Sequence, residues 1–186
     1  IVIIGGGTGT FTLLSGLRKF PSNKTVILSS ADDGGSNGIL RKDLGVMPPG
    51  DIRQCLVGLS YTQKEMQVLF NFRFDKGSLV GHSVGNIIIA ALEKITGNID
   101  ASIELASKML NVRGQVLPVS LKPTTLSAVL ENGKTLVGEH NIDDQDSSKQ
   151  KAVKIKQLQL KPNATANPKA LAAIKEADVI IFGPGD

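Results

Sequence analysis

The sequence has 186 residues, a formal net charge of +4, one cysteine and no tryptophan. Hydrophobic residues make up 41% and charged residues 20%, an ordinary globular composition that argues against a disordered or membrane-embedded chain. No apolar run approaches the ~20 residues of a transmembrane helix, and the first residues form a strand-like run rather than the basic and apolar pattern of a signal peptide. We therefore predict one domain, or one with an appendage, that has no membrane span and lies in the cytoplasm.

Two compositional features narrow the function classes. The modest charge and the single tyrosine do not favour a nucleic-acid binder, which more often has a basic face with aromatic stacking groups. Lysines between residues 149 and 161 follow a run of acidic residues, so we interpret them as a solvated strand face. Cys55 lies in an apolar helical stretch and is predicted to be a buried filler, with a catalytic thiol as the weaker alternative.

The chain opens with the features of a βαβ unit. Residues 1–4 are uniformly apolar, as in a central parallel strand buried on both faces. A glycine-rich loop at 5–10 follows, then apolar residues at helical spacing until Pro21, and then a second strand at 25–30. This order predicts an α/β fold with a Rossmann-like, doubly wound, mostly parallel sheet.

A long loop and several helices are expected next. Residues 31–50 contain five glycines and two prolines, and a loop of this length is usually functional or disordered. Beyond it, Asp51, a capping box at 62–65 and Asp100 are predicted to cap helix starts, and Gly97 to end a helix.

A change of periodicity follows residue 112. Residues 115–121 look extended, Asn132-Gly133 is a strong hairpin turn signal, and residues 153–160 alternate with one slip that suggests a bulge. We predict a small antiparallel β insertion that also contains an acidic loop around His140.

The last part is expected to return to the parallel sheet. Asn167-Pro168 starts a helix in the favoured order, and residues 178–182 read as a buried strand. The predicted organisation is a Rossmann-like nucleotide-binding core, a hairpin-rich insertion and a return to the core, over 1–112, 113–161 and 162–186. Because the chain begins mid-strand and ends in a glycine loop, we expect a piece of a longer protein, truncated at the C-terminus, with some site residues outside it.

Three glycine loops are candidate anion sites. They lie at 5–10, 32–38 and 183–186, at predicted strand ends or helix starts, where absent side chains and unpaired amides favour phosphate. The first loop departs from the G-x-G-x-x-G/A pattern at Thr10 and lacks the lysine of a P-loop. A plain strand-to-helix turn is therefore the alternative for it.

Charged residues near these loops suggest further contacts. Asp32 and Asp33 follow the second strand, where an acid could bind ribose hydroxyls or Mg²⁺, with a simple turn role as the alternative. Arg41, Lys42 and Arg53 could bind phosphates, although surface charge is the plainer interpretation of each.

Residues 81–85 match the G-x-S-x-G pattern of α/β-hydrolases. The preceding strand is weak, and His140 is the only histidine downstream, so a serine hydrolase is a minor alternative. We expect instead that Ser83 caps its own helix and that His82 and Asn86 point toward a ligand.

Taken in order, seven motifs resemble the YvcK-like gluconeogenesis factor family, which is related to the CofD-type phospholactate transferases; they lie at 4–9, 31–36, 40–45, 48–53, 81–86, 110–114 and 182–186. The resemblance implies a Rossmann-like sheet with a β insertion, a role in growth on gluconeogenic carbon sources and in cell shape, and a UDP-sugar ligand, notably UDP-N-acetylglucosamine. It implies no established reaction. It also implies that the family's chains continue past the final Gly-Pro-Gly.

Our leading hypothesis is a nucleotide-sugar-binding regulatory factor with the diphosphate on the amides of residues 6–10. Its rival is a Mg²⁺-dependent CofD-like transferase of a phosphate-containing group, with Asp32 as the candidate metal ligand. A protein partner in cell-wall or carbon metabolism and a homo-oligomer stay open. The candidate ligand-binding residues are Gly5, Gly6, Gly7, Thr8, Gly9, Thr10, Asp32, Asp33, Gly34, Gly35, Ser36, Arg41, Asp51, Arg53, His82, Ser83, Asn86, Gly183, Pro184 and Gly185.

Overall fold

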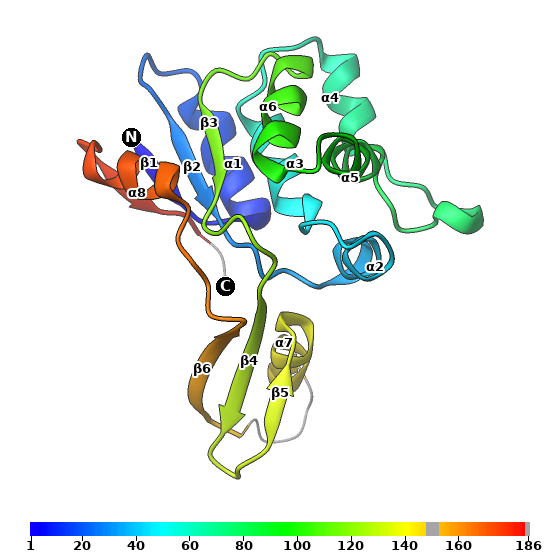
Figure 1. The fold of residues 1–186 in the computed structure, drawn as a ribbon. Coiled ribbons are helices and arrows are strands. Elements are labelled where there is room, and N and C mark those ends of the chain that lie inside the picture. The colour runs from blue at the N-terminus through cyan, green and yellow to red at the C-terminus, as the bar shows by residue number, and fades with distance from the viewer. Residues whose placement is uncertain (148–152, 185–186) are drawn as a thin grey trace.

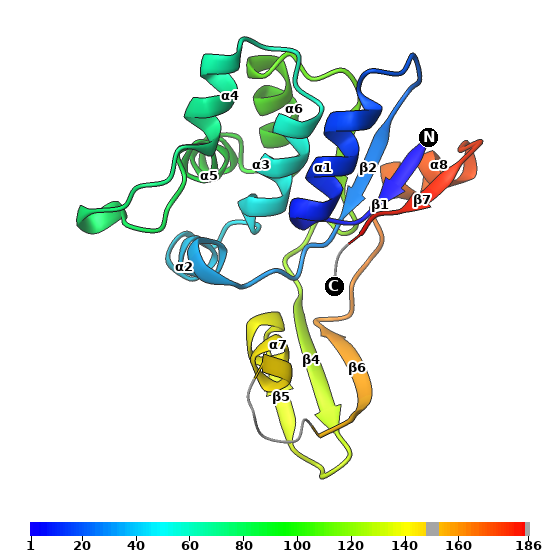
Figure 2. The same cartoon turned by 180° about the vertical axis from the view of Figure 1, so that it is seen from behind.

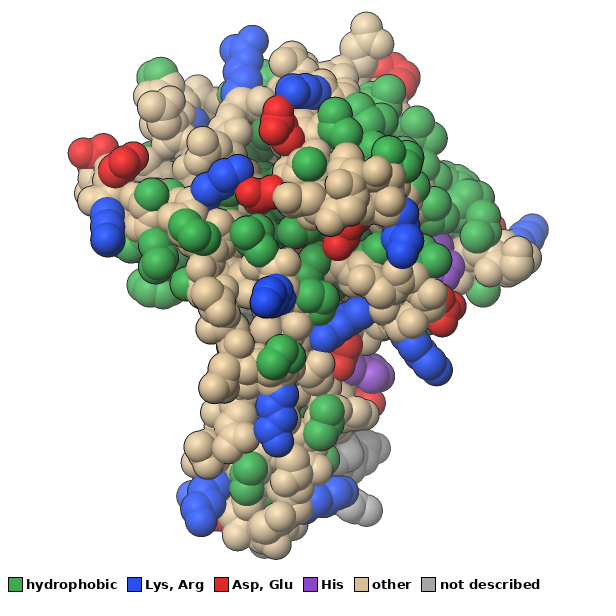
Figure 3. Space-filling model, viewed as in Figure 1, with side chains coloured by type: hydrophobic (Ala, Val, Ile, Leu, Met, Phe, Trp, Pro, Cys, Tyr) green, Lys and Arg blue, Asp and Glu red, His purple; other side chains and the backbone are tan. Residues whose placement is uncertain are grey.

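The computed structural model describes residues 1–147 and 153–184 and has two parts. The larger part is an α/β unit built on a parallel sheet, and the smaller is a lobe built on an antiparallel sheet (Figure 1). In the face shown in Figure 3, lysine and arginine side chains are scattered among other residues and form no continuous basic surface. No helix in the described ranges is both long and apolar enough to cross a membrane.

The parallel sheet confirms the predicted Rossmann-like class. Its four strands have the order β3-β2-β1-β7, and every pairing is parallel. The strands are β1 Val2–Ile4, β2 Thr25–Leu28, β3 Gln115–Pro118 and β7 Ile180–Phe182. The first βαβ unit runs outward from β1, and the later strand β7 pairs on the other side of β1. The strand order therefore reverses at β1, where open α/β sheets bind ligands at the carboxyl ends of their strands.

Helices cover both faces of this sheet (Figures 1 and 2). One face carries α1 Gly7–Leu17 and α3 Pro49–Gly58, with α4 Lys64–Asn71, α5 Val84–Thr96 and α6 Ile99–Met109 beyond them. The other carries α8 Pro168–Lys175. Successive side chains of a strand point to opposite faces of the sheet, so both faces need a cover. Ile3 packs into the large helical core, whereas Val2 and Ile27 pack against Ala170 of α8. Cys55 is fully buried in the large core, which confirms its role as a filler.

The small lobe confirms the predicted antiparallel insertion. Its strand order is β5-β4-β6, with α7 against the sheet; the elements are β4 Thr125–Leu130, β5 Thr135–Val137, α7 Glu139–Ser147 and β6 Ile155–Lys161. Gly133 has a φ of +82° in the turn between β4 and β5, which confirms the Asn-Gly hairpin. The pairing of β6 skips Lys156, which confirms the predicted bulge.

Three sequence interpretations differ from the observed elements. Residues 115–118 pair in parallel with β2, so this strand belongs to the main sheet and the antiparallel part begins at β4. Much of the predicted long loop is α2 Gly35–Leu44, which Gly45 ends with a φ of +67°. The acidic loop around His140 is α7. Both helices have few apolar residues, so hydrophobic periodicity did not reveal them.

The predicted caps are only partly correct. Ser83 accepts a hydrogen bond from the Asn86 amide at 3.3 Å, and Asn167 caps α8, as predicted. The capping box at 62–65 is wrong, because Gln63 is the N-cap and forms no side-chain cap bond. Asp51 and Asp100 do not cap either: Pro48 is the N-cap of α3, and Asn98 caps α6. A 3₁₀ helix, η1 Gly77–Leu79, lies in the arm between α4 and α5.

Gly85 allows α5 to pack closely on its neighbours, which leads to a stability prediction. A Cβ at Gly85 would lie 2.6 Å from the Phe70 carbonyl oxygen and 2.7 Å from Cδ of Arg53. Gly85→Ala should therefore lower the free energy of unfolding by about 1–3 kcal/mol, measured by urea denaturation. Gly16→Ala, a helical site with no atom within 4 Å of the new Cβ, is the control and should raise it by about 0.5–1 kcal/mol. Equal effects of the two substitutions would contradict this packing.

Candidate ligand-binding site

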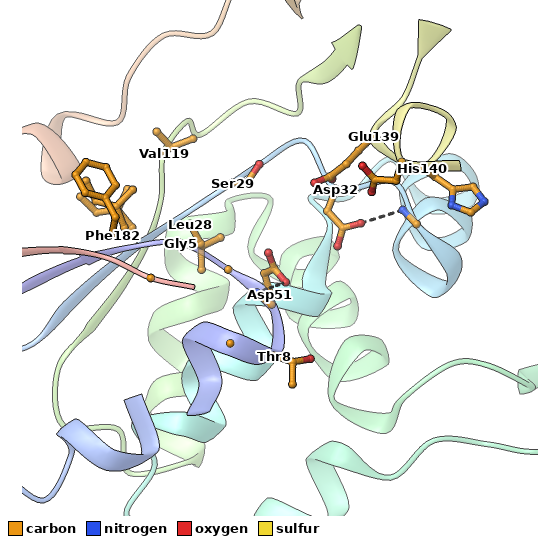
Figure 4. A pocket seen from close by; sticks show the side chains of 18 residues that line it. Gly5, Thr8, Leu28, Ser29, Asp32, Asp51, Val119, Glu139, His140 and Phe182 are labelled. Carbon is orange, nitrogen blue, oxygen red and sulfur yellow. Dashed lines mark hydrogen bonds between the residues drawn. The ribbon is translucent and has the colours of Figure 1, made fainter. Parts of the chain in front are cut away.

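A pocket of about 810 Å³ lies at the carboxyl ends of the parallel strands. The loop after β1 forms its floor, and α7 of the small lobe faces that loop across the cavity (Figure 4). Its volume falls within the range of small-molecule sites, about 300–1,000 Å³. The lining residues are Ile4, Gly5, Gly6, Gly7, Thr8, Gly9, Ile27, Leu28, Ser29, Asp32, Gly34, Asp51, Val119, Glu139, His140, Asp143, Phe182 and Gly183.

The glycine loop brings bare backbone to this pocket. Gly7 has a φ of +69°, and a Cβ built on it meets no atom within 4 Å, so the backbone there faces open space. At Gly9 a Cβ would collide with the carbonyl of Pro184, which follows β7. Gly6 is the N-cap of α1 and has no side chain, so it cannot cap the first-turn amides of that helix. Such amides attract anions.

The Asp51 side chain is hydrogen-bonded to one of these amides. Its Oδ1 accepts a hydrogen bond from the Gly7 amide at 2.9 Å, and a Cβ at Gly6 would overlap its carboxylate. Burial and the nearby Asp32 raise the pKa of Asp51, whereas the Gly7 bond and Arg53 act to lower it. Asp51 therefore contacts the glycine loop, as expected of a site residue. It binds the first turn of α1 and does not cap its own helix, α3.

Asp32 and Asp33 accept hydrogen bonds that position the loops around the pocket. Asp32 accepts hydrogen bonds from the Gly34 amide at 2.9 Å and from the Asn37 side chain. Asp33 accepts one from the His140 amide at 3.1 Å, which links the core to the first turn of α7. Asp32 lines the pocket, whereas Asp33 positions α7.

Glu139 is a site residue that the sequence prediction missed. It is half-buried, and its Oε2 is buried without a hydrogen-bond partner among the described residues. Burial, followed by the charges of Asp32, Asp143, Asp51 and Asp33, raises its pKa to about 7. A helix in place of the expected loop at 139–147 is what carries Glu139 to the pocket, so only tertiary contact reveals it.

The other predicted residues fall into three groups. Gly35, Ser36, Arg53 and Asn86 line a second, smaller cavity that shares Asp32, Gly34 and Asp51 with the first. His82 is buried behind them, and its Nδ1 lies 2.8 Å from Oγ of Ser36.

A second group lies apart from both cavities. Thr10 is fully buried beneath the loop, and Arg41 donates to Oγ1 of Thr125 at 2.9 Å, which joins α2 to the small lobe. Ser83 is fully buried at its cap position, so no substrate reaches it, and the hydrolase alternative is wrong.

Gly183 and Pro184 lie beside the glycine loop, as the prediction places them. Gly185 lies outside the described residues. The ligand-binding role of all these residues stays a prediction.

The pocket carboxylates offer few ligands to Mg²⁺. Within residues 1–147 and 153–184, no group of three or more His, Cys, Asp or Glu side chains is arranged to hold a metal ion. Mg²⁺, however, commonly takes one or two carboxylates and completes its shell with phosphate and water. Asp32 fits that limited role at the pocket wall, although its oxygens already accept two hydrogen bonds.

The whole chain, residues 1–186, matches the family model described as 2-phospho-L-lactate transferase CofD. The chain belongs to the CofD family. It is 44% identical to proteins named gluconeogenesis factor from Halalkalibacterium halodurans and Bacillus subtilis, over 100% of this chain and 56% and 57% of theirs. A crystal structure of a protein from Bacillus halodurans has a TM-score of 0.92 and 44% identity, and covers 100% of this chain and 58% of that one. This member of the CofD family thus spans about three fifths or less of these relatives' length, and the family resemblance is confirmed.

The raised pKa of Glu139 predicts a pH-dependent stability. Its pKa rises from an ordinary value near 4.5 to about 7 on folding, so the protonated carboxyl favours the fold, and this contribution is lost as pH rises through 7. Glu139→Gln should melt at a higher temperature than the parent above about pH 7, and the difference should shrink toward about pH 4.5. Thermal denaturation across this range measures it.

Glu131→Gln, at an exposed turn of the small lobe, removes the same charge and serves as the control. It should leave the melting profile parallel to that of the parent. If the melting profile of Glu139→Gln also runs parallel to that of the parent, the pKa of Glu139 is not raised on folding.

Proposed function

We propose that the 810 Å³ pocket binds a nucleotide sugar, with UDP-N-acetylglucosamine as the first candidate. The diphosphate lies on the amides of Thr8 and Gly9, and the chain is the ligand-binding part of a cytoplasmic regulatory factor for growth on gluconeogenic carbon sources and for cell shape. The observation that carries the proposal is the glycine loop at the switch point of the sheet, where the start of α1 lines a pocket of ligand size and its N-cap, Gly6, has no side chain. The relatives' name, gluconeogenesis factor, supports the metabolic role.

The acidic lining affects how a diphosphate would bind. Asp32, Asp51 and Glu139 all line the pocket, and each would repel a phosphate placed against it. A Mg²⁺ ion between Asp32 and the diphosphate would offset this repulsion, as the metal neutralises phosphate charge. Ligand binding should therefore be tighter with Mg²⁺ than without it.

Gly7 provides a direct test of the proposed phosphate position. Gly7→Ala places a methyl group on the bare backbone of the pocket and should weaken UDP-N-acetylglucosamine binding by about tenfold or more, which is about 1.4 kcal/mol, in titration calorimetry with Mg²⁺.

Gly97→Ala is the matched control, because Gly97 has a φ of +65°, meets no atom within 4 Å and lies at the end of α5. Both substitutions put alanine in the left-handed region, so each should lose about 1–2 kcal/mol of stability. Only Gly7→Ala should lose affinity. No heat of binding by the parent at millimolar ligand, or equal affinities of the two variants, would count against the proposal.

A CofD-like transferase is the second candidate. It is supported by the family membership and by Glu139, whose pKa of about 7 suits a group that accepts or donates a proton near neutral pH. As a transferase, the chain would hold Mg²⁺ through Asp32 to neutralise charge on the phosphate-containing donor, and Glu139 would take the proton of the acceptor hydroxyl. The acceptor oxygen would bond to the donor phosphorus as the P–O bond to the nucleoside monophosphate breaks and that group leaves.

Turnover separates the two candidates. Phosphorus NMR of the chain with UDP-N-acetylglucosamine, Mg²⁺ and glycerol as a generic alcohol shows whether a new phosphate ester forms. A transferase predicts Mg²⁺-dependent formation that Asp32→Asn abolishes and that the exposed Asp43→Asn leaves intact. An unchanged spectrum despite measured binding favours the regulatory binder.

A further inference from the structure

A second cavity of about 190 Å³ adjoins the main pocket. Asp32, Gly34 and Asp51 line both cavities. The other walls of the smaller one come from the start of α2, from α3 and α5, and from the arm after α4. At about 30 Å³ per water molecule, this volume exceeds a single bound water several times over. It has room for a phosphate group with a short organic substituent.

Arg53 is a buried cation on the wall of this cavity. It is 6% exposed, and its Nε donates to Oδ1 of Asn86 at 3.0 Å, while Nη1 donates to Oδ1 of Asn71. Both partners are neutral amides, and Nη2 makes no hydrogen bond with the described residues. Buried charges in proteins are normally paired, so a guanidinium held only by amides favours an anion nearby.

A second guanidinium lines the same cavity. Arg73 belongs to the arm between α4 and α5, and it donates to the Gly81 carbonyl. Neither arginine takes part in an ion pair formed within the described ranges. Burial, and then the charge of Arg73, lower the pKa of Arg53, whereas Asp51 raises it. Two like charges are therefore close enough to repel each other, and an anion between them would relieve that repulsion.

The remaining walls also offer donors. Gly35 and Ser36 lie in the first turn of α2, where amides have no intrahelical acceptor, and Gly34 caps that helix without a side chain. The Ser36 hydroxyl lies 2.8 Å from Nδ1 of the buried His82, which fixes its position on the wall. Gly85, where a Cβ would collide with Arg53, holds the Arg53 stem tightly against α5.

We propose that this cavity is a second anion subsite, in which Arg53, Arg73 and the first turn of α2 bind the phosphate group of a small phosphate monoester. The subsite is distinct from the glycine-loop pocket, because Ser36, Arg53 and Arg73 line only the smaller cavity, and we expect the two to be filled together. This subsite would bind its phosphate whichever nucleotide sugar fills the larger pocket. In a transferase it would hold the second substrate, and in a regulatory binder it would hold a second effector.

The test uses glycerol 3-phosphate, with inorganic phosphate and uncharged glycerol as comparison ligands. In titration calorimetry the two phosphates should bind and glycerol should not. Arg73→Gln should weaken the binding of glycerol 3-phosphate by about tenfold or more, as expected for loss of a charge-assisted hydrogen bond. Arg73 is exposed, so this variant should fold, whereas Arg53→Gln carries the greater risk of unfolding.

Arg113→Gln is the matched control. Arg113 is exposed and its guanidinium lies over the Tyr61 ring, outside both cavities, so removal of its charge should leave affinity unchanged. Saturating UDP-N-acetylglucosamine should not displace glycerol 3-phosphate. Displacement would show that the nucleotide's own phosphates fill the cavity and would overturn the proposal of a second ligand.

The proposal is also overturned if glycerol 3-phosphate does not bind at millimolar concentration, or if Arg73→Gln and Arg113→Gln lose the same affinity for it. If UDP-N-acetylglucosamine itself does not bind, the proposed function fails. The comparison of the two arginine variants then decides the second subsite alone.

Discussion

The hydrogen bond from the Gly7 amide to the Asp51 carboxylate, at 2.9 Å, is the contact on which the site depends. It forms because Gly6 has no side chain, since a Cβ there would occupy the position of the carboxylate. The bond fixes the first turn of α3 against the loop after β1. Arg53, two residues after Asp51 on the same helix, is thereby held on the wall of the smaller cavity. One contact thus sets the geometry of both cavities.

The charges around this contact are unevenly distributed. Asp32 and Asp51 line both cavities, Glu139 lines only the larger pocket, and Arg53 and Arg73 line only the smaller one. Coulomb attraction between the carboxylates and the arginines offsets part of the cost of burying each group, but burial, and then the neighbouring carboxylates, still raise the pKa of Glu139. This separation suits two ligands of different character: a metal-accompanied diphosphate and a small free phosphate.

The sequence predicted those parts of the fold that depend on local signals. The apolar first strand, the Asn132-Gly133 turn and the Ser83 cap are each determined by a few neighbouring residues, and all three are confirmed. Strand pairing is not local, so β3 was assigned to the insertion although it pairs with β2. Polar helices also escape a hydrophobic pattern, and for that reason α7 and its Glu139 were missed.

A crystal structure of the chain grown with saturating UDP-N-acetylglucosamine and Mg²⁺ would locate the nucleotide. We expect diphosphate oxygens within hydrogen-bond distance of the Thr8 and Gly9 amides, with the Arg53 cavity free of the nucleotide. A nucleotide bound away from the glycine loop, or one whose phosphates lie between Arg53 and Arg73, would contradict the proposed binding site.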